Sequence, residues 1–180
     1  MKKLIFIIIL IVVFAIGIMK FSGKTALVPT PTPAQALSDY KNIAYQIDGQ
    51  EILLKNGSAE SPAGPDSEET VTTEYFGNEA KGDFNNDGTG DVAFVLTQSG
   101  GGTGVFFYVA VALKTVGGYK GTNVIFLGDR IAPQTTEFRN GEIIVNYADR
   151  KPNEPFSTTP SVGVSKYLKV NGLQLVEVMK

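Results

Sequence analysis

The residues with the clearest chemical potential lie between positions 83 and 91, where the sequence runs Asp-Phe-Asn-Asn-Asp-Gly-Thr-Gly-Asp. Side chains that carry oxygen stand at the first, third, fifth and ninth positions, and glycine stands at the sixth. Calcium takes about six to eight oxygen ligands, which a tightly wound loop supplies from alternate side chains and from the carbonyl of its seventh residue. The spacing therefore predicts one Ca²⁺ site, with ligands from Asp83, Asn85, Asp87, the Thr89 carbonyl and Asp91.

The charges of this loop favour the same interpretation. Asp83, Asp87 and Asp91 bring three carboxylates into a small volume, which is unfavourable unless a cation neutralises them. A simpler alternative is an Asx-rich turn, since Asn and Asp side chains bond readily to nearby backbone groups and reverse the chain. The sequence leaves both interpretations open.

This loop resembles the loops of integrin-type FG-GAP repeats, which follow the pattern D-x-D/N-x-D-G-x-x-D. The resemblance implies the same five ligands. The loop is less similar to an EF-hand, because its twelfth position is Phe94 instead of a bidentate Glu. The pattern occurs once, whereas a propeller needs at least about four blades, so a propeller fold is not implied.

Three further segments, 75–80, 128–133 and 145–150, resemble a bacterial family of secreted or membrane-anchored β-domain proteins. That resemblance extends from Ile43 onward and implies a location outside the cytoplasm. It implies no activity.

The composition excludes several kinds of catalysis. The sequence contains no His and no Cys, so a Ser-His-Asp triad, an imidazole zinc site and a thiol nucleophile are all ruled out. We therefore predict no catalytic residues, and the leading interpretation is a binding or structural module. The alternative is a cell-envelope hydrolase that uses a pair of carboxylates. Its candidates are Glu137, Glu142, Asp149 and Glu154.

The N-terminus predicts an anchor followed by a spacer. Residues 4–19 form an unbroken apolar run between Lys3 and Lys20, which predicts a signal anchor or transmembrane helix over residues 1–21. A cleaved signal peptide is the alternative. Alternating Pro and Thr in residues 22–37 predict an extended linker. Residues 38–180 are then an extracytoplasmic domain on the outer side of the cell membrane.

The charge of the chain after Lys24 limits its partners. This part carries all 18 acidic residues but only 12 of the 16 basic ones, a net charge of −6. Such a domain repels phosphate backbones, so nucleic acid is not an expected partner. The expected partners are the membrane, through the N-terminal helix, and a protein or glycan of the cell envelope.

The body of the chain predicts an all-β fold, a single antiparallel sandwich or barrel-like domain of about nine or ten strands. Asp48-Gly49, Asn140-Gly141 and Asn171-Gly172 each separate two β-rich runs, which is typical of tight hairpins. Residues 92–96 and 105–113 predict a central hairpin buried on both faces. Residues 119–127 predict the next strand, and the acidic segment 57–70 predicts a loop.

The glycine-rich segment 99–104 joins the two strands of that central hairpin. It is not expected to bind phosphate, because no Lys-Ser/Thr pair and no helix follows its glycines.

Overall fold

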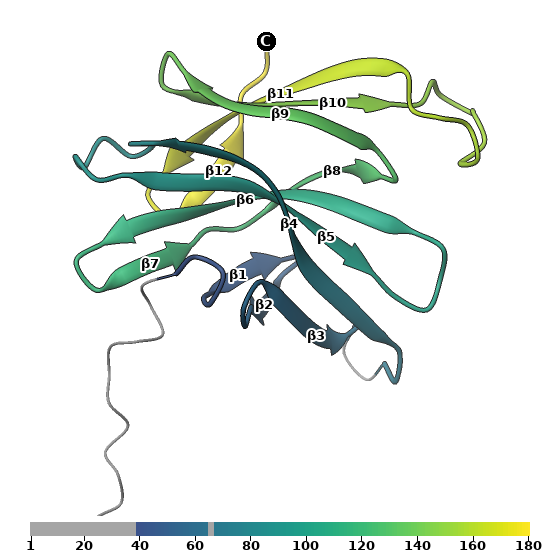
Figure 1. Ribbon diagram of the computed structural model, residues 1–180, viewed down its shortest axis with the longest axis horizontal. Helices are drawn as coiled ribbons and strands as arrows, with labels where there is room; N and C mark the ends of the chain where they lie inside the picture. Colours follow the sequence, from purple (N-terminus) through teal and green to yellow (C-terminus); the bar gives the residue numbers. More distant parts are fainter. Residues whose placement is uncertain (1–38, 65–66) are drawn as a thin grey trace, which may run out of the picture. The chain divides into compact units, whose positions relative to one another are not determined.

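The computed structural model describes residues 39–64 and 67–180, and this part of the chain is all-β (Figure 1). Within it no helix is long and apolar enough to cross a membrane. The predicted anchor (1–21) and linker (22–37) lie outside the described residues. The strands are β1 (Ala44–Ile47), β2 (Gln50–Leu53), β3 (Ser58–Pro62), β4 (Thr70–Gly82), β5 (Asp91–Ser99), β6 (Val105–Thr115), β7 (Gly118–Gly121), β8 (Ile125–Asp129), β9 (Ala132–Arg139), β10 (Glu142–Asp149), β11 (Val162–Asn171) and β12 (Gln174–Glu177).

A six-stranded antiparallel sheet lies at the centre, in the order β3-β4-β5-β6-β7, with β8 also paired to β6. The strands curl into a half-barrel. β5 and β6 are its core strands, and both are apolar on their two faces. The prediction of a central hairpin buried on both sides is therefore confirmed.

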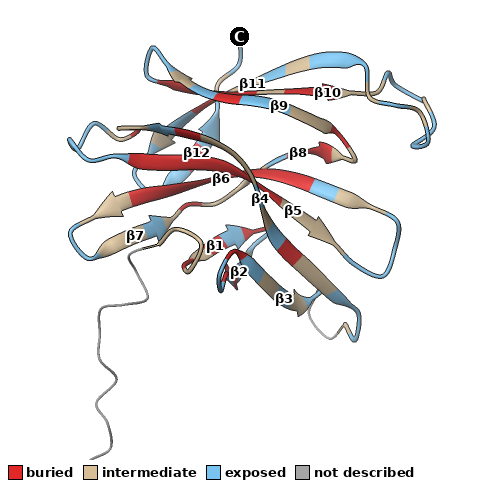
Figure 2. Ribbon diagram, viewed as in Figure 1, coloured by how far each residue is buried: buried red, intermediate tan, exposed pale blue. Residues whose placement is uncertain are grey.

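Each face of the central sheet packs against a different sheet. One face meets the four-stranded sheet β12-β11-β10-β9, and their shared core includes Val95, Val109 and Val145. The other face meets the β1–β2 hairpin, and that core includes Tyr45, Phe94 and Leu54. Figure 2 shows the resulting buried stretches along β5, β6 and β10.

All three predicted hairpins are confirmed, and two of the three turns lie at the expected dipeptide. β1 pairs with β2 across Asp48-Gly49 and β9 with β10 across Asn140-Gly141. β11 pairs with β12 across Gly172-Leu173, one residue beyond the predicted turn, because Asn171 still pairs with Gln174. Asp48 and Gly49 have φ values of 49° and 83°, and Asn140 and Gly141 have 55° and 74°. Two successive positive φ angles are what a type I′ turn requires, and Asn, Asp and Gly adopt them at little cost.

The single strand predicted over residues 119–127 is wrong, because the chain forms two strands there. β7 pairs with residues Ala112–Thr115 of β6, whereas β8 pairs with Phe106–Val109. Between them, the side chain of Asn123 bonds to the backbone N and O of Leu175 at 2.8 and 3.0 Å. These contacts hold the chain as it passes from one end of β6 to the other.

The loop predicted over residues 57–70 is also wrong in part. Its first half is β3, which pairs with β4 from Ser58↔Glu74 to Pro62↔Thr70. With β3 and the divided strand included, the described residues contain twelve strands. β3 lies at the sheet edge, where short strands with charged residues and Pro are common. A strand of this composition lacks the apolar alternation by which strands are predicted from sequence, so the sequence alone predicts a loop there.

Candidate metal centre

The predicted calcium loop connects β4 to β5 and is anchored in the core at its second residue. Phe84 is 6% exposed, and its ring centroid lies 4.8 Å from that of Phe138 on β9. A Cβ on Gly82 would lie 2.5 Å from the Phe138 ring, so only glycine fits at the end of β4. This anchor was not predicted from the sequence, although an aromatic residue inside an otherwise polar loop is its signal.

Asp91 closes the loop from the buried side. Its carboxylate is fully buried, and its Oδ2 accepts the backbone N–H of Phe84 at 2.9 Å. Oδ1 accepts the backbone N–H of Lys114 at 2.8 Å. This one side chain therefore joins the start of the loop, its end and strand β6.

The other oxygen side chains of the loop bond to its own backbone. Asp83 accepts the N–H groups of Asp87 at 3.0 Å and of Gly88 at 2.9 Å. Asp87 accepts the N–H of Thr89 at 2.8 Å and the side-chain amide of Asn85 at 2.9 Å. Asn86 and Gly88 have φ values of 58° and 85°, which wind the loop tightly. The loop therefore brings Asp83, Asn85, Asp87 and Thr89 into one hydrogen-bonded group.

The environment shifts the pKa values of two of these carboxyls in opposite directions. Hydrogen bonds from Thr89 and Asn85 lower the pKa of the exposed Asp87. Burial raises the pKa of Asp91, and the charges of Asp87 and Asp83 raise it further, against the two backbone hydrogen bonds. Asp91 is thus a buried carboxyl whose charged form is disfavoured where it lies.

The residue types of the loop fit a hard cation, since carboxylate, amide and carbonyl oxygens are the ligands that calcium takes. A carboxylate oxygen that accepts one hydrogen bond keeps a lone pair for a metal. Within the described residues, however, no three acidic side chains lie close enough together to share one ion. Binding would therefore require side chains to rotate, and Asp87 is exposed enough to do so.

The four carboxylates considered for a hydrolase are in separate surroundings. Glu142 lies 2.9 Å from Lys180 Nζ and 3.6 Å from Lys169 Nζ, and the hydrogen bond from Lys180 lowers its pKa. A general acid needs the opposite shift. Asp149 stands at the far end of the same strand, roughly 23 Å away at about 3.3 Å per residue.

The remaining two candidates also make local contacts. Glu137 accepts the hydroxyl of Thr135 at 3.1 Å, and Glu154 accepts the backbone N–H of Lys151 at 2.9 Å. None of these contacts favours a catalytic pair.

Comparison of this chain with protein-family models, with curated proteins and with solved structures found no match. The fold and the loop define an all-β domain with a candidate metal loop.

Proposed function

We propose that this domain is a binding or structural module, held outside the cytoplasm by an N-terminal membrane anchor, and that its 83–91 loop binds one calcium ion. The observation that carries the proposal is the buried carboxylate of Asp91, whose pKa is raised by burial and further by the charges of Asp87 and Asp83. The ligands would be Asp83, Asn85, Asp87, the Thr89 carbonyl and Asp91.

The loop lacks a protein cation that could balance these charges. The ion pairs between described residues involve Glu79, Asp129, Glu154, Glu177 and Glu142, and none involves Asp83, Asp87 or Asp91. Three carboxylates without a basic partner repel one another, and a buried one also loses its hydration. A bound divalent cation would neutralise the repulsion between the carboxylates, and its coordination would replace the hydration that the buried carboxylate has lost.

Calcium at this position would have a structural role. The loop joins two neighbouring strands of the central sheet, and Asp91 already ties it to Lys114 of β6. An ion held by the half-buried Asp83 and Asn85 and the exposed Asp87, together with Asp91, would fix the outer half of the loop to its buried half. It would stabilise the fold by mass action, since an unfolded chain has no assembled ligand set.

Calorimetry on the full chain in detergent micelles tests the proposal. Titration with CaCl₂ should show one ion bound per chain with a Kd between about 1 μM and 1 mM, the range of sensor and extracellular sites. Asp87→Ala should abolish the heat. The matched control is Glu60→Ala, which removes one exposed negative charge from β3 and should bind calcium like the parent chain.

Thermal unfolding gives an independent readout of the same site. Calcium should raise the melting temperature of the parent chain and of Glu60→Ala relative to chelator, and should leave Asp87→Ala unchanged. If no heat were observed and the melting curves in calcium and chelator coincided, residues 83–91 would be an Asx-rich turn without a metal.

The anchor is supported by the apolar run of residues 4–19 between Lys3 and Lys20. Protease added to intact spheroplasts should digest the domain and leave a membrane-bound N-terminal fragment. Protection of the domain until the membrane is lysed would contradict an extracytoplasmic location.

A further inference from the structure

The β1–β2 hairpin leaves one end of the central sheet face uncovered, and aromatic side chains gather there. Phe106 on β6 and Phe126 on β8 are 41% and 48% exposed. Their ring centroids lie 6.4 Å apart, and that of Tyr108 lies 5.4 Å from Phe126. We call these three residues the aromatic platform. The rings of Phe106 and Phe126 are tilted by 49° to each other, and their exposed faces together offer apolar surface to a ligand.

Polar side chains border the platform. Gln98 is the β5 partner of Phe106, and its Nε2 donates to Thr73 at 3.1 Å, so the orientation of its amide is fixed. On the other side, the hydroxyl of Tyr108 donates to Asp48 at 3.0 Å, which places the β1–β2 turn beside the platform. Amide and carboxylate groups therefore lie at the edges of an aromatic surface.

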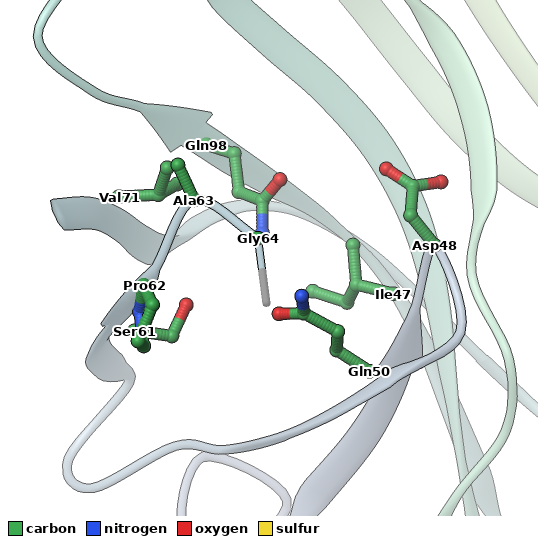
Figure 3. A pocket seen from close by; sticks show the side chains of 9 residues that line it. All are labelled: Ile47, Asp48, Gln50, Ser61, Pro62, Ala63, Gly64, Val71 and Gln98. Carbon is green, nitrogen blue, oxygen red and sulfur yellow. The ribbon is translucent and has the colours of Figure 1, made fainter. Parts of the chain in front are cut away.

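Two hollows extend from this border. The first has a volume of about 260 Å³, and Figure 3 shows Asp48, Gln50 and Gln98 around it. The second has a volume of about 380 Å³ and is lined by Phe106 and by the glycine-rich segment. The two hollows share Ala63, Val71 and Gln98 in their linings, so they lie next to each other, and we call the pair the groove. Ligand sites commonly enclose roughly 300–1,000 Å³.

The glycine-rich segment 99–104 forms part of the wall of the second hollow. A Cβ on Gly104 would lie 2.9 Å from the Phe106 ring, and a Cβ on Gly101 would lie 2.5 Å from a carboxylate oxygen of Glu69. Glycine therefore lets the backbone approach both side chains closely. Gly100, Gly102 and Gly104 line the second hollow, and since they have no side chains their peptide groups border the groove.

The chemistry of the groove favours one class of ligand. No Lys or Arg lines either hollow, while Asp48 and Glu69 make the groove acidic, so phosphate and acidic sugars are disfavoured. A neutral sugar ring has an apolar C–H face that packs on an aromatic ring and a rim of hydroxyls that both donate and accept hydrogen bonds. Gln50, Gln98, Asp48 and exposed peptide groups supply the matching partners.

We propose that this groove, together with the aromatic platform beside it, binds a neutral oligosaccharide, with sugar rings stacked on Phe106 and Phe126 and hydroxyls bonded to Gln98, Gln50 and Asp48. The proposal rests on the domain being a binding module, and it names the class of ligand. It does not depend on calcium, because no residue of the 83–91 loop lines the groove.

The test is calorimetry on the full chain in a detergent without a sugar headgroup. The probes are the hexasaccharides of β-1,4-linked glucose and β-1,4-linked N-acetylglucosamine. At least one should bind with a Kd of roughly 10 μM to 1 mM, as expected for an open site. Phe106→Ala and Gln98→Ala should each weaken that binding by about tenfold or more, since each removes a stacking or hydrogen-bonding partner.

Two controls separate the possible outcomes. Val116→Ala removes an exposed apolar side chain from the β6–β7 turn, and Asp87→Ala removes a proposed calcium ligand. Both should bind sugar like the parent chain, so a failed calcium site and a failed sugar site give different results. Phe126→Ala provides a second platform variant should Phe106→Ala fail to fold.

The proposal is overturned if neither hexasaccharide binds at millimolar concentration, or if both platform variants bind with unchanged affinity. It is also overturned if an unfolded polypeptide, reduced and carboxymethylated lysozyme, binds with dependence on Phe106 while the sugars do not. In that case the groove is a peptide site.

Discussion

The backbone N–H of Lys114 donates a hydrogen bond to the carboxylate of Asp91 at 2.8 Å. The backbone ladder between β5 and β6 ends at Val92↔Ala112, so this side chain continues the pairing beyond the last backbone partner. The same carboxylate holds the N–H of Phe84, where the loop begins. Asp91 therefore has a role in the fold that does not depend on whether the loop binds a metal.

We first predict that Asp91→Ala destabilises the domain even in chelator. The substitution leaves two backbone N–H groups without an acceptor, and the free energy of unfolding should fall by about 2–4 kcal/mol. Urea denaturation in EDTA measures this loss. Asp87→Ala is the control, because Asp87 is exposed and its removal should cost less than about 1 kcal/mol. Equal losses in the two variants would contradict the structural role of Asp91.

The second prediction concerns pH. The pKa of Asp91 is raised in the folded domain, so in chelator its contribution favours the fold below the ordinary value of 3.8 and is lost as the pH rises through the raised pKa. Calcium would bind the ionised form, so the increase in melting temperature caused by calcium should be larger at pH 7 than at pH 4. Melting curves at both pH values, in calcium and in EDTA, measure the difference. A calcium effect independent of pH would contradict it.

The parts of the fold that depend on neighbouring residues could be predicted from the sequence. The turns at Asp48-Gly49 and Asn140-Gly141 were predictable because the conformational preference of two residues decides them. The break between β7 and β8 was not, since it depends on Asn123, which bonds to Leu175 far along the chain. Local patterns carry no information on such contacts.

The candidate site also has features that could be predicted from the sequence and features that could not. The spacing of Asp83, Asn85 and Asp87 predicts that they share one loop, and the structure brings them into one hydrogen-bonded group. The burial of Asp91 depends on Lys114, which lies 23 positions away in the sequence and only becomes a neighbour when β6 pairs with β5. Whether the loop binds calcium stays a prediction.

The third prediction is that Gly121→Ala displaces the β1–β2 hairpin. A Cβ on Gly121 would lie 2.1 Å from the carbonyl oxygen of Ala44 and 2.7 Å from the ring of Tyr45, so the hairpin would have to move. Overpacking of this kind costs about 1–3 kcal/mol. The matched control is Gly163→Ala on β11, where an added Cβ meets nothing within 4 Å. Urea denaturation compares the two, and equal stability would contradict a close approach at Gly121.

The fourth prediction concerns the carboxylate of Glu79, which accepts hydrogen bonds from the hydroxyls of Tyr40 and Tyr75, each at 2.5 Å. Burial acts to raise the pKa of Glu79, but these hydrogen bonds lower it on balance. Burial, together with the hydrogen bond to Glu79, raises the pKa of Tyr40 to about 12. The three side chains join the start of the folded domain to β4.

A lowered carboxyl pKa stabilises the fold above the ordinary value of 4.5, and that stability is lost as the pH falls through the folded pKa. Glu79→Gln should therefore lower the free energy of unfolding by about 1 kcal/mol at pH 7 and reduce its decline toward pH 3. Glu74→Gln is the control, since Glu74 is exposed on the same strand. Urea denaturation across this pH range measures both. If Glu79→Gln kept the full decline of the parent chain, a different carboxyl would be responsible for the acid sensitivity of the fold.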